Sequence, residues 1–473
     1  MPTESKSHAE NLMPALLGRV LMGLVVATVT ATLFLISVLT HSAALMIAGF
    51  VVAGTAASYS LLRFLIRYSR HHEIDIFAPW VAFPIVYVLW FAIGSINFGD
   101  LPPNFGNGLF DPIPLRMWVL YGVGLIAYFL GILWIMKVRK ASHRATVGSA
   151  WNYKTSIFIL RSILIGSLAL WIIVVALYGV PSLSSDAAEA RLALHGPIYQ
   201  LFIEGAWTSF ILLPVLLWVG GADRQMRWRY FSVLALLAVL MSLLAGRANV
   251  VIPLITLLIA RHYTRAKIAA SKAVLLAVSV FVAASVAGYF RDLAFTGSLE
   301  WLTLLGIPTP VAPFVYSGLY IRYSVATFRD LVALIPAHAP FQWGALSFSP
   351  FRTFMPGRQL MSDEMIKNLL GRSFTGSGEP ASLLGPLYAD WGVLGISVGM
   401  FLFGALCTAT YRAMRESRSP LRIVIYAWVM QTAFLSLFAC LFPYIGTLLS
   451  PLAWLCMNLF MKQKDAPRVV PGP

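Results

Sequence analysis

This sequence contains few charged residues. Only 11% of its 473 residues are Asp, Glu, Lys or Arg, whereas a soluble globular protein carries about 25%. Apolar residues make up 59% of the chain, and the mean hydropathy is +0.78. Because a protein in water covers its surface with charged side chains, this chain is expected to expose most of its surface to lipid. The composition predicts an all-α polytopic membrane protein.

Cysteine is also scarce. Cys407, Cys440 and Cys456 all lie in apolar stretches near the C-terminus. Their number and positions argue against a disulfide framework, and no Cys/His spacing indicates a zinc site. The three cysteines are therefore expected to be small core residues, and no cofactor is expected.

Acidic residues are outnumbered, with 19 Asp and Glu against 35 Lys and Arg, a net charge of +16. In a soluble protein this excess would suggest binding of nucleic acid. In a membrane protein, basic residues hold loops on the cytoplasmic side. We expect membrane lipid, and no nucleic acid, as a partner.

Apolar runs predict twelve transmembrane helices, two of which are short. The helices are Leu16–Thr40, Ala43–Ile66, Ile76–Ile96, Ile113–Met136, Ile157–Tyr178, Ile198–Val219, the short pair Tyr230–Leu244 and Val250–Ala260, Ala273–Phe290, Leu383–Ala409, Ile423–Cys440 and Ile445–Met461. Basic residues gather in alternate connections, whereas 97–111 and 441–443 contain none. This pattern predicts that both termini lie in the cytoplasm. We expect the membrane to be a bacterial inner membrane.

The chain divides into three parts around one long loop. Residues 1–290 hold helices 1–9, residues 291–380 form a large periplasmic loop, and residues 381–473 hold helices 10–12 and a cytoplasmic tail. The loop is too long for an ordinary connection. Its apolar runs Trp301–Ile307 and Val311–Tyr320 are short and interrupted by proline. We interpret them as helices on the outer membrane surface; alternatively, Ala312–Leu334 enters the membrane as a re-entrant hairpin.

Arg247 is the leading candidate for a binding residue. It follows Gly246 in the turn between two helices of only about sixteen and eleven apolar residues, too short to cross a hydrocarbon core of about 30 Å. The turn is then expected below the outer surface, where an arginine indicates a functional site. Snorkelling to lipid headgroups is the alternative. Four further outer arginines could bind an anion or be plain surface charges. They are Arg191, Arg291 at the end of the ninth helix, Arg352 and Arg358.

The most distinctive stretch is residues 374–395, where glycines and polar residues run into a spanning helix. Lipid rejects such groups unless they face a cavity. Glu379, Tyr388 and Asp390 are therefore candidate acid/base groups or contacts to sugar hydroxyls. Tyr388 could equally be an aromatic residue of the membrane interface.

Four features together resemble the Wzy-type O-antigen polymerases, the oligosaccharide repeat-unit polymerases of bacteria. They are Gly179–Ser184 followed by Arg191, the Gly246-Arg247 turn, the loop that opens at Arg291-Asp292, and the stretch from Thr375 through Leu384–Gly392 to Gly395.

The resemblance implies a GT-C-like fold and a metal-independent glycosyltransferase. Its substrates would be oligosaccharides linked to undecaprenyl diphosphate, and it allows a chain-length regulator protein as partner. The growing glycan would pass to a new lipid-linked repeat unit at the periplasmic face. Arg247, Arg191, Arg291, Arg352 and Arg358 would bind diphosphate, and Glu379 or Asp390, beside Tyr388, would act as the base.

Two other functions stay open. A glycan ligase uses the same lipid-linked donor, and hydropathy does not separate it from a polymerase. A lipid-linked glycan flippase or transporter would usually carry ionisable residues in the middle of its helices. Here Glu204 is an isolated acid near the start of the sixth helix.

Overall fold

The structure is a computed structural model, and it describes most of the chain after residue 74. The described residues are 75–95, 111–138, 151–181, 194, 197–220, 223–244, 247–265, 267–296, 310, 312–352, 360–372, 379–417, 419–441 and 445–462. All of them except Asp75 belong to one unit, Ile76–Pro473. The predicted helices Leu16–Thr40 and Ala43–Ile66 lie outside the described residues.

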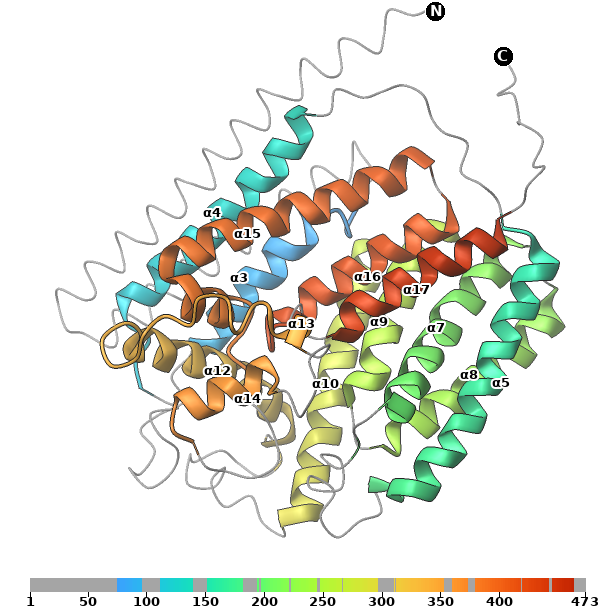
Figure 1. Cartoon of the computed structure of the whole chain (residues 1–473), viewed down its shortest axis with the longest axis horizontal. Helices are drawn as coiled ribbons and strands as arrows, with labels where there is room; N and C mark the ends of the chain where they lie inside the picture. The colour runs from blue at the N-terminus through green and yellow to red at the C-terminus, as the bar shows by residue number, and fades with distance from the viewer. Residues whose placement is uncertain are drawn as a thin grey trace, which may run out of the picture. The chain divides into compact units, whose positions relative to one another are not determined.

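The described residues fold into helices, with two isolated β-bridges and no strand. The helices are α3 (Ala82–Gly94), α4 (Leu115–Val138), α5 (Tyr153–Tyr178), α7 (Pro197–Val219), α8 (Arg224–Ser242), α9 (Arg247–Thr264), α10 (Ala270–Thr296), α12 (Ala312–Leu334), α13 (Ser349–Arg352), α14 (Ser362–Leu369), α15 (Leu384–Ser417), α16 (Pro420–Ser436) and α17 (Ile445–Met461). Each predicted helix from Ile76–Ile96 onward has a counterpart among them (Figure 1). The all-helical class is confirmed.

Four of these helices, α4, α5, α7 and α15, are long and apolar enough to cross a membrane. This supports the predicted polytopic membrane protein. A total of twelve spans stays a prediction.

Local sequence explains where several helices begin. Asn152 and Asp223 each accept a hydrogen bond from the backbone N–H three residues later, at 3.2 and 2.6 Å, which caps α5 and α8. Ser419 caps α16 in the same way at 3.3 Å, with Pro420 in the first helical position. Such caps satisfy backbone N–H groups that a helix leaves without partners at its start.

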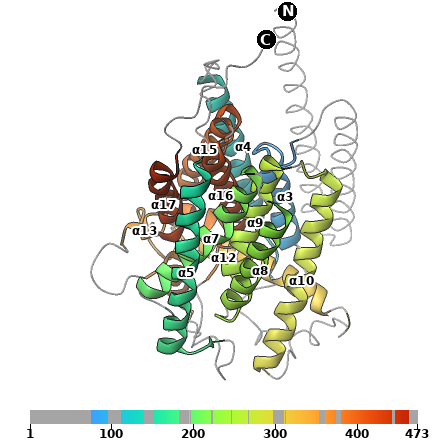
Figure 2. The ribbon, with the colours of Figure 1, turned by 90° about the vertical axis from the view of Figure 1, so that its right-hand side faces the viewer.

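Two groups of helices pack together. Helices α3, α4, α12 and α15 form one group, in which α4 and α15 lie side by side (Figures 1 and 2). Helices α5, α7, α8 and α9 form the other group, and α16 contacts both.

Glycine allows the backbones of α4 and α15 to touch. A Cβ on Gly131 of α4 would lie 2.0 Å from the carbonyl oxygen of Phe401. A Cβ on Gly404 of α15 would lie 2.1 Å from that of Tyr128. Small residues permit this close approach between helices in lipid, where dispersion contacts replace the hydrophobic effect as the attractive force.

Helix α15 is interrupted near its start. Trp391 (φ −142°, ψ 17°) and Gly392 (φ 63°, ψ −142°) leave the helical conformation, and the backbone of Gly392 is one that essentially only glycine adopts. Residues 384–390, which we call the half-helix, fold back on the spanning part. A Cβ on Gly395 would meet the carbonyl oxygen of Leu387 at 2.0 Å. The distinctive stretch of residues 374–395 therefore ends in a broken helix.

Helix α12 differs from the predicted surface helices of the large loop. It is one helix of 23 residues that packs against α3, α10 and α15, with Val325, Phe328 and Leu331 buried. Pro313, which suggested an interruption, lies in the first turn, where proline does not break a helix.

Helices α8 and α9 are longer than predicted. They contain 19 and 18 residues, and at about 1.5 Å per residue each is close to the ~30 Å of the hydrocarbon core. The difference arises because polar residues belong to the helices. Arg224 is the first residue of α8, and Arg261 and His262 lie in the last turn of α9. Neither helix is among the four that are long and apolar enough to cross a membrane, so whether this pair spans the membrane stays a prediction.

Candidate functional site

Helix α12 carries two arginines and one aspartate, Asp330, in a largely apolar sequence. Arg322 and Arg329 are seven residues apart and so share one face of the helix. Arg322 is fully buried, and its guanidinium donates hydrogen bonds to the carbonyl oxygens of Gly94 (2.8 Å) and Asp111 (2.6 Å). These two residues lie at the end of α3 and just before α4. Arg322 therefore ties α12 to the ends of two neighbouring helices.

Asp330 joins two arginines from different parts of the chain. Arg329 donates to Asp330 through Nε (3.0 Å) and Nη2 (2.7 Å), and through Nη1 to the carbonyl oxygen of Asp111 (2.9 Å). Arg372, which follows α14, donates to the other oxygen of Asp330. Arg329 therefore binds one oxygen of Asp330 with two N–H groups, and Arg372 binds the other.

Glu379 is completely buried and pairs with Arg372. Arg372 Nη1 lies 2.8 Å from Glu379 Oε2, and the hydroxyl of Thr327 donates to the same oxygen at 3.0 Å. Glu379 Oε1 accepts no hydrogen bond from the described residues. A buried charge needs such an ion pair to stay ionised. We call Arg322, Arg329, Asp330, Arg372 and Glu379 the arginine cluster.

The pKa shifts in the cluster reflect burial and neighbouring charge. Burial, with a smaller effect of the Arg329 charge, lowers the pKa of Arg322 to about 10. Burial raises the pKa of Asp330, against the opposing effect of the two arginines. Burial acts to lower the pKa of Arg372, but Glu379 and Asp330 raise it on balance. The cluster therefore holds charged groups that depend on one another.

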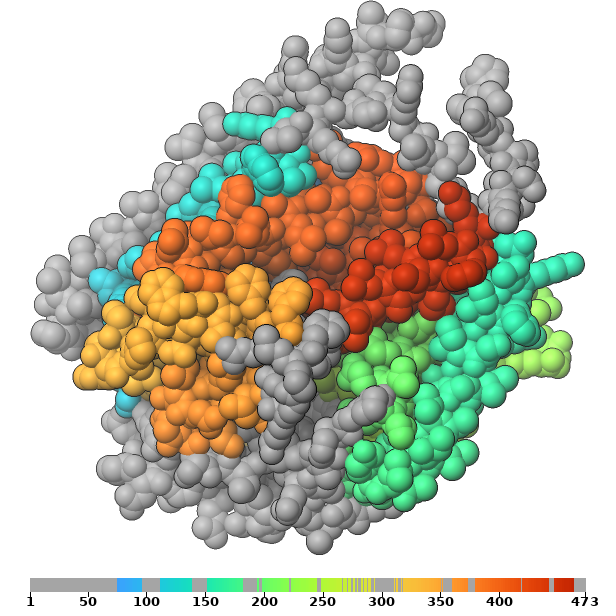
Figure 3. Space-filling model, in the orientation of Figure 1, coloured from blue at the N-terminus to red at the C-terminus, as the bar shows by residue number. Residues whose placement is uncertain are grey.

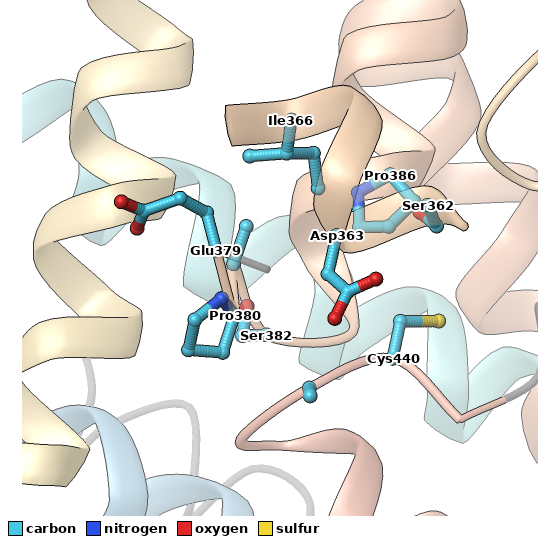
Figure 4. Close-up of a pocket in the computed structure, with 10 residues that line it drawn as sticks. Ser362, Asp363, Ile366, Glu379, Pro380, Ser382, Pro386 and Cys440 are labelled. Atoms are coloured by element: carbon cyan, nitrogen blue, oxygen red, sulfur yellow. The ribbon is translucent and has the colours of Figure 1, made fainter. Parts of the chain in front are cut away.

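A small cavity lies beside the backbone of Glu379. It is lined by residues that include Ser362, Asp363, Ser382 and Cys440, and the space within it for the centre of a water-sized molecule is about 10 Å³, close to the ~10–15 Å³ that one water requires. Figure 4 shows the carboxylates of Glu379 and Asp363 pointing in different directions. Among the described residues, no three His, Cys, Asp or Glu side chains gather as a metal site would require.

Asp390, at the end of the half-helix, holds a loop in place. It is fully buried, and its two oxygens accept hydrogen bonds from the backbone N–H groups of Leu346 (3.1 Å) and Ser347 (2.7 Å). Both carboxylate oxygens are thus engaged with the backbone.

Tyr388 lies on the same half-helix and is also buried. Its hydroxyl donates to the carbonyl oxygen of Ile335 (3.1 Å) and accepts a hydrogen bond from Arg116 of α4. The Arg116 guanidinium lies 5.7 Å from the centre of the Tyr388 ring. Phe328 of α12 packs edge-on against the same ring at 6.1 Å, so Tyr388 borders the helix that carries the cluster.

Of the five arginines predicted to bind diphosphate, the structure describes the backbone of three and the side chain of none. Arg191 and Arg358 lie outside the described residues. Arg247 is the first residue of α9 and Arg352 is the last of α13, with their side chains outside the described part. Arg291, whose side chain is likewise not described, lies within α10, which continues to Thr296 rather than ending at Arg291 as predicted. Their role stays a prediction.

Sequence reasoning missed Arg116 and most of the arginine cluster. Arg322, Arg329 and Arg372 fall within the predicted loop 291–380, and none of them is among the candidates named from the sequence. The available signal was Arg322 and Arg329, seven residues apart and so on one face of a 23-residue helix of largely apolar character. Arg372 and Arg116 gave no comparable signal.

Comparison with known protein families gives one match. The model of the family described as putative O-antigen polymerase matches residues 75–437, well over half of the chain. The chain belongs to this family. The match runs from before α3 through α16 and includes the arginine cluster and the half-helix. Neither a curated protein nor a solved structure matches the chain.

Membership confirms the predicted resemblance to the O-antigen polymerases. It supports the general function of a membrane-bound polymerase that acts as a glycosyltransferase on lipid-linked oligosaccharides.

Proposed function

We propose that this protein elongates a surface polysaccharide at the periplasmic face of the bacterial inner membrane. It transfers the growing glycan from undecaprenyl diphosphate onto the sugar of a new lipid-linked repeat unit. The observation that supports this best is Glu379, a fully buried carboxylate held between Arg372 and Thr327 in a family of putative O-antigen polymerases.

Glu379 is the proposed base. The hydroxyl oxygen of the acceptor sugar attacks the anomeric carbon of the donor, and the hydroxyl proton passes to the Glu379 carboxylate. The bond between the anomeric carbon and the diphosphate oxygen breaks, and its electron pair leaves with the lipid diphosphate. Glu379 Oε1 accepts no hydrogen bond from the described residues, which suits an acceptor for that proton.

Asp390 and Tyr388 are better suited to positioning. Both Asp390 oxygens already accept backbone N–H groups. The Tyr388 hydroxyl is engaged with Arg116 and the Ile335 carbonyl. We propose that they hold the half-helix and its loop while Glu379 takes the proton.

The diphosphate is the proposed ligand of the other arginines. Arg247, Arg191, Arg291, Arg352 and Arg358 would neutralise the charge that the leaving group gains, without a metal ion. The arginine cluster carries three guanidinium groups and two carboxylates, and most of that charge is compensated internally. We therefore assign the cluster to the acceptor and the five separate arginines to the donor.

The wider architecture is part of the proposal. It comprises twelve spans, a GT-C-like arrangement, both termini in the cytoplasm and, as an additional partner, a chain-length regulator protein. The supporting observations are the four described spanning helices and the alternation of basic loops.

The test is deletion of the gene, complementation with variants and separation of the surface glycans by size. Loss of the ladder with a single capped unit on deletion supports a polymerase. Loss of all capping identifies a ligase, and an unchanged glycan identifies a transporter.

Glu379→Gln is expected to lower chain elongation by about 100-fold or more, the usual contribution of a general base. The control is Glu416→Gln at the far end of α15, where Glu416 lies 3.9 Å from Arg412 in a partly exposed ion pair. This variant is expected to elongate normally. Normal ladders from a well-expressed Glu379→Gln protein would remove Glu379 from the reaction.

A further inference from the structure

The connection between α12 and α14 exposes a group of aromatic side chains. Trp343 is 75% exposed, and Phe348 and Phe351 are each 57% exposed. Phe341 lies 6.3 Å from Trp343, and Trp391 lies 5.8 Å from Phe348, between ring centres. We call these five residues the aromatic patch. Large apolar groups exposed together indicate a surface that is covered in the working protein.

The loop that carries the patch is fixed in place. The backbone N–H groups of Gln342 and Trp343 donate to the carbonyl oxygens of Ala389 (2.9 Å) and Asp390 (3.2 Å). The Asp390 carboxylate binds the next turn through two further N–H groups. The aromatic rings are therefore presented by an ordered backbone that is joined to the half-helix.

The aromatic patch continues an apolar surface of α15. Leu394, Val398, Leu402 and Leu406 follow one another at intervals of four residues, and each is between 42% and 68% exposed. Residues at this spacing form one stripe along a helix. Because α15 is long and apolar enough to span a membrane, the stripe faces lipid. Trp391 of the aromatic patch lies three residues before Leu394, the first residue of the stripe. The patch and the stripe are therefore adjacent. Figure 3 shows the surface of residues around 340–350 directly beside that of α15.

The composition of the loop favours lipid as the occupant. The thirteen residues 339–351 contain no charged side chain. The one amide side chain among them, that of Gln342, donates to the carbonyl of Pro340 at 2.7 Å. A sugar-binding surface places polar groups around its rings to bind hydroxyls, whereas aromatic rings beside the end of a spanning helix are typical of the membrane–water interface.

We propose that the aromatic patch lies in the headgroup region of the bilayer and anchors the loop at the membrane surface. Through the hydrogen bonds to Ala389 and Asp390, this contact sets the height of the half-helix relative to the lipid headgroups. The inference concerns the bilayer as partner and does not depend on the reaction proposed above.

The test is to measure how deeply the loop enters the bilayer. Nitroxide labels are attached to single cysteines, Gln342→Cys and Phe348→Cys, in a Cys456→Ala background, since Cys407 and Cys440 are buried. The proteins are reconstituted in nanodiscs of phosphatidylethanolamine and phosphatidylglycerol. The accessibility of each label to oxygen and to a water-soluble nickel chelate is then compared. Gln342→Cys keeps all five aromatic rings, so a folding defect of Phe348→Cys would not decide the result.

Two positions calibrate the scale. Asn368→Cys, exposed on α14, is expected to report water, and Leu402→Cys on the exposed stripe is expected to report the hydrocarbon core. We expect the oxygen-to-nickel accessibility ratio at positions 342 and 348 to lie severalfold above that at 368 and below that at 402. A ratio equal to that at 368 overturns the proposal, as does a ratio equal to that at 402. If the labels are exposed to water and added lipid-linked oligosaccharide lowers their accessibility to the nickel chelate, the patch binds sugar. That result would also overturn the proposal.

Discussion

The ion pair between Arg372 and Glu379 shows how a charge is kept inside an apolar protein. The Glu379 side chain is fully buried and that of Arg372 is 11% exposed. Removal of one partner of a buried pair leaves the other charge uncompensated, which costs about 3–5 kcal/mol. Replacement of both partners by apolar side chains of similar size is often neutral for stability. Stability and function can therefore be separated at this pair.

We predict that Arg372→Met lowers the free energy of unfolding by about 3–5 kcal/mol. The double variant Arg372→Met with Glu379→Leu is expected to recover most of that loss and to stay unable to elongate glycans. Stability is measured by heating the protein in detergent and determining the folded fraction by size-exclusion chromatography. The glycan ladder measures activity. An active double variant would show that the pair serves the fold alone.

At the level of helices, the contact between α4 and α15 depends on the absence of a side chain at two positions. Gly131→Ala would place a methyl group against the carbonyl oxygen of Phe401. We predict that the helices move apart, at a cost of about 1–3 kcal/mol from overpacking. Thermal unfolding of the purified variant measures this loss.

Gly122 is the matched control on the same helix. A Cβ at Gly122 would meet nothing within 4 Å, so Gly122→Ala is expected to leave the unfolding temperature nearly unchanged. Equal losses from Gly122→Ala and Gly131→Ala would mean that close packing at Gly131 does not account for the effect.

The helices themselves were largely predictable from the sequence. Runs such as Ile198–Val219 and Ile445–Met461 agree with α7 and α17 within one residue, because apolar side chains in lipid need a helix to satisfy the backbone. The bounds of α8 and α9 were not predictable from hydropathy alone, since their ends are polar. Likewise, the apolar pattern of α15 gives no sign that the helix is interrupted at Trp391.

The candidate site was predictable only where local sequence was unusual. Glu379, Tyr388 and Asp390 stood out as polar residues at the start of a spanning helix, and all three are buried beside α12 or its loop. The hydrogen bond from Thr327 to Glu379 could not be predicted, because Thr327 lies 52 residues earlier in the chain. Pairing over such a distance follows from the packing of helices and leaves no pattern in the sequence.

At the scale of the whole molecule, the orientation in the membrane is open to a direct test. The basic residues Arg224, Arg227 and Arg229 predict a cytoplasmic start for α8. The large loop that includes α14 is predicted to be periplasmic. In a Cys456→Ala background, we predict that Asn368→Cys reacts with a membrane-impermeant maleimide in intact spheroplasts.

Arg224→Cys is the counterpart on the other side. Arg224→Cys is expected to react only after the membrane is permeabilised. A gel shift of protein that is purified after labelling measures this reaction. Reaction of both cysteines in intact spheroplasts, or of Arg224→Cys alone, would contradict the predicted orientation.

The bonds that Arg322 makes to Gly94 and Asp111 have a consequence for biosynthesis. These carbonyl groups precede Arg322 by 228 and 211 residues, so α3 and α4 leave the ribosome long before their guanidinium donor exists. The two helices must wait in the translocation machinery or in lipid with these carbonyls bound to water or to other groups. Nascent chains truncated before residue 322 are thus expected to leave the backbone at Gly94 and Asp111 open to protease, and chains extended past α12 to protect it.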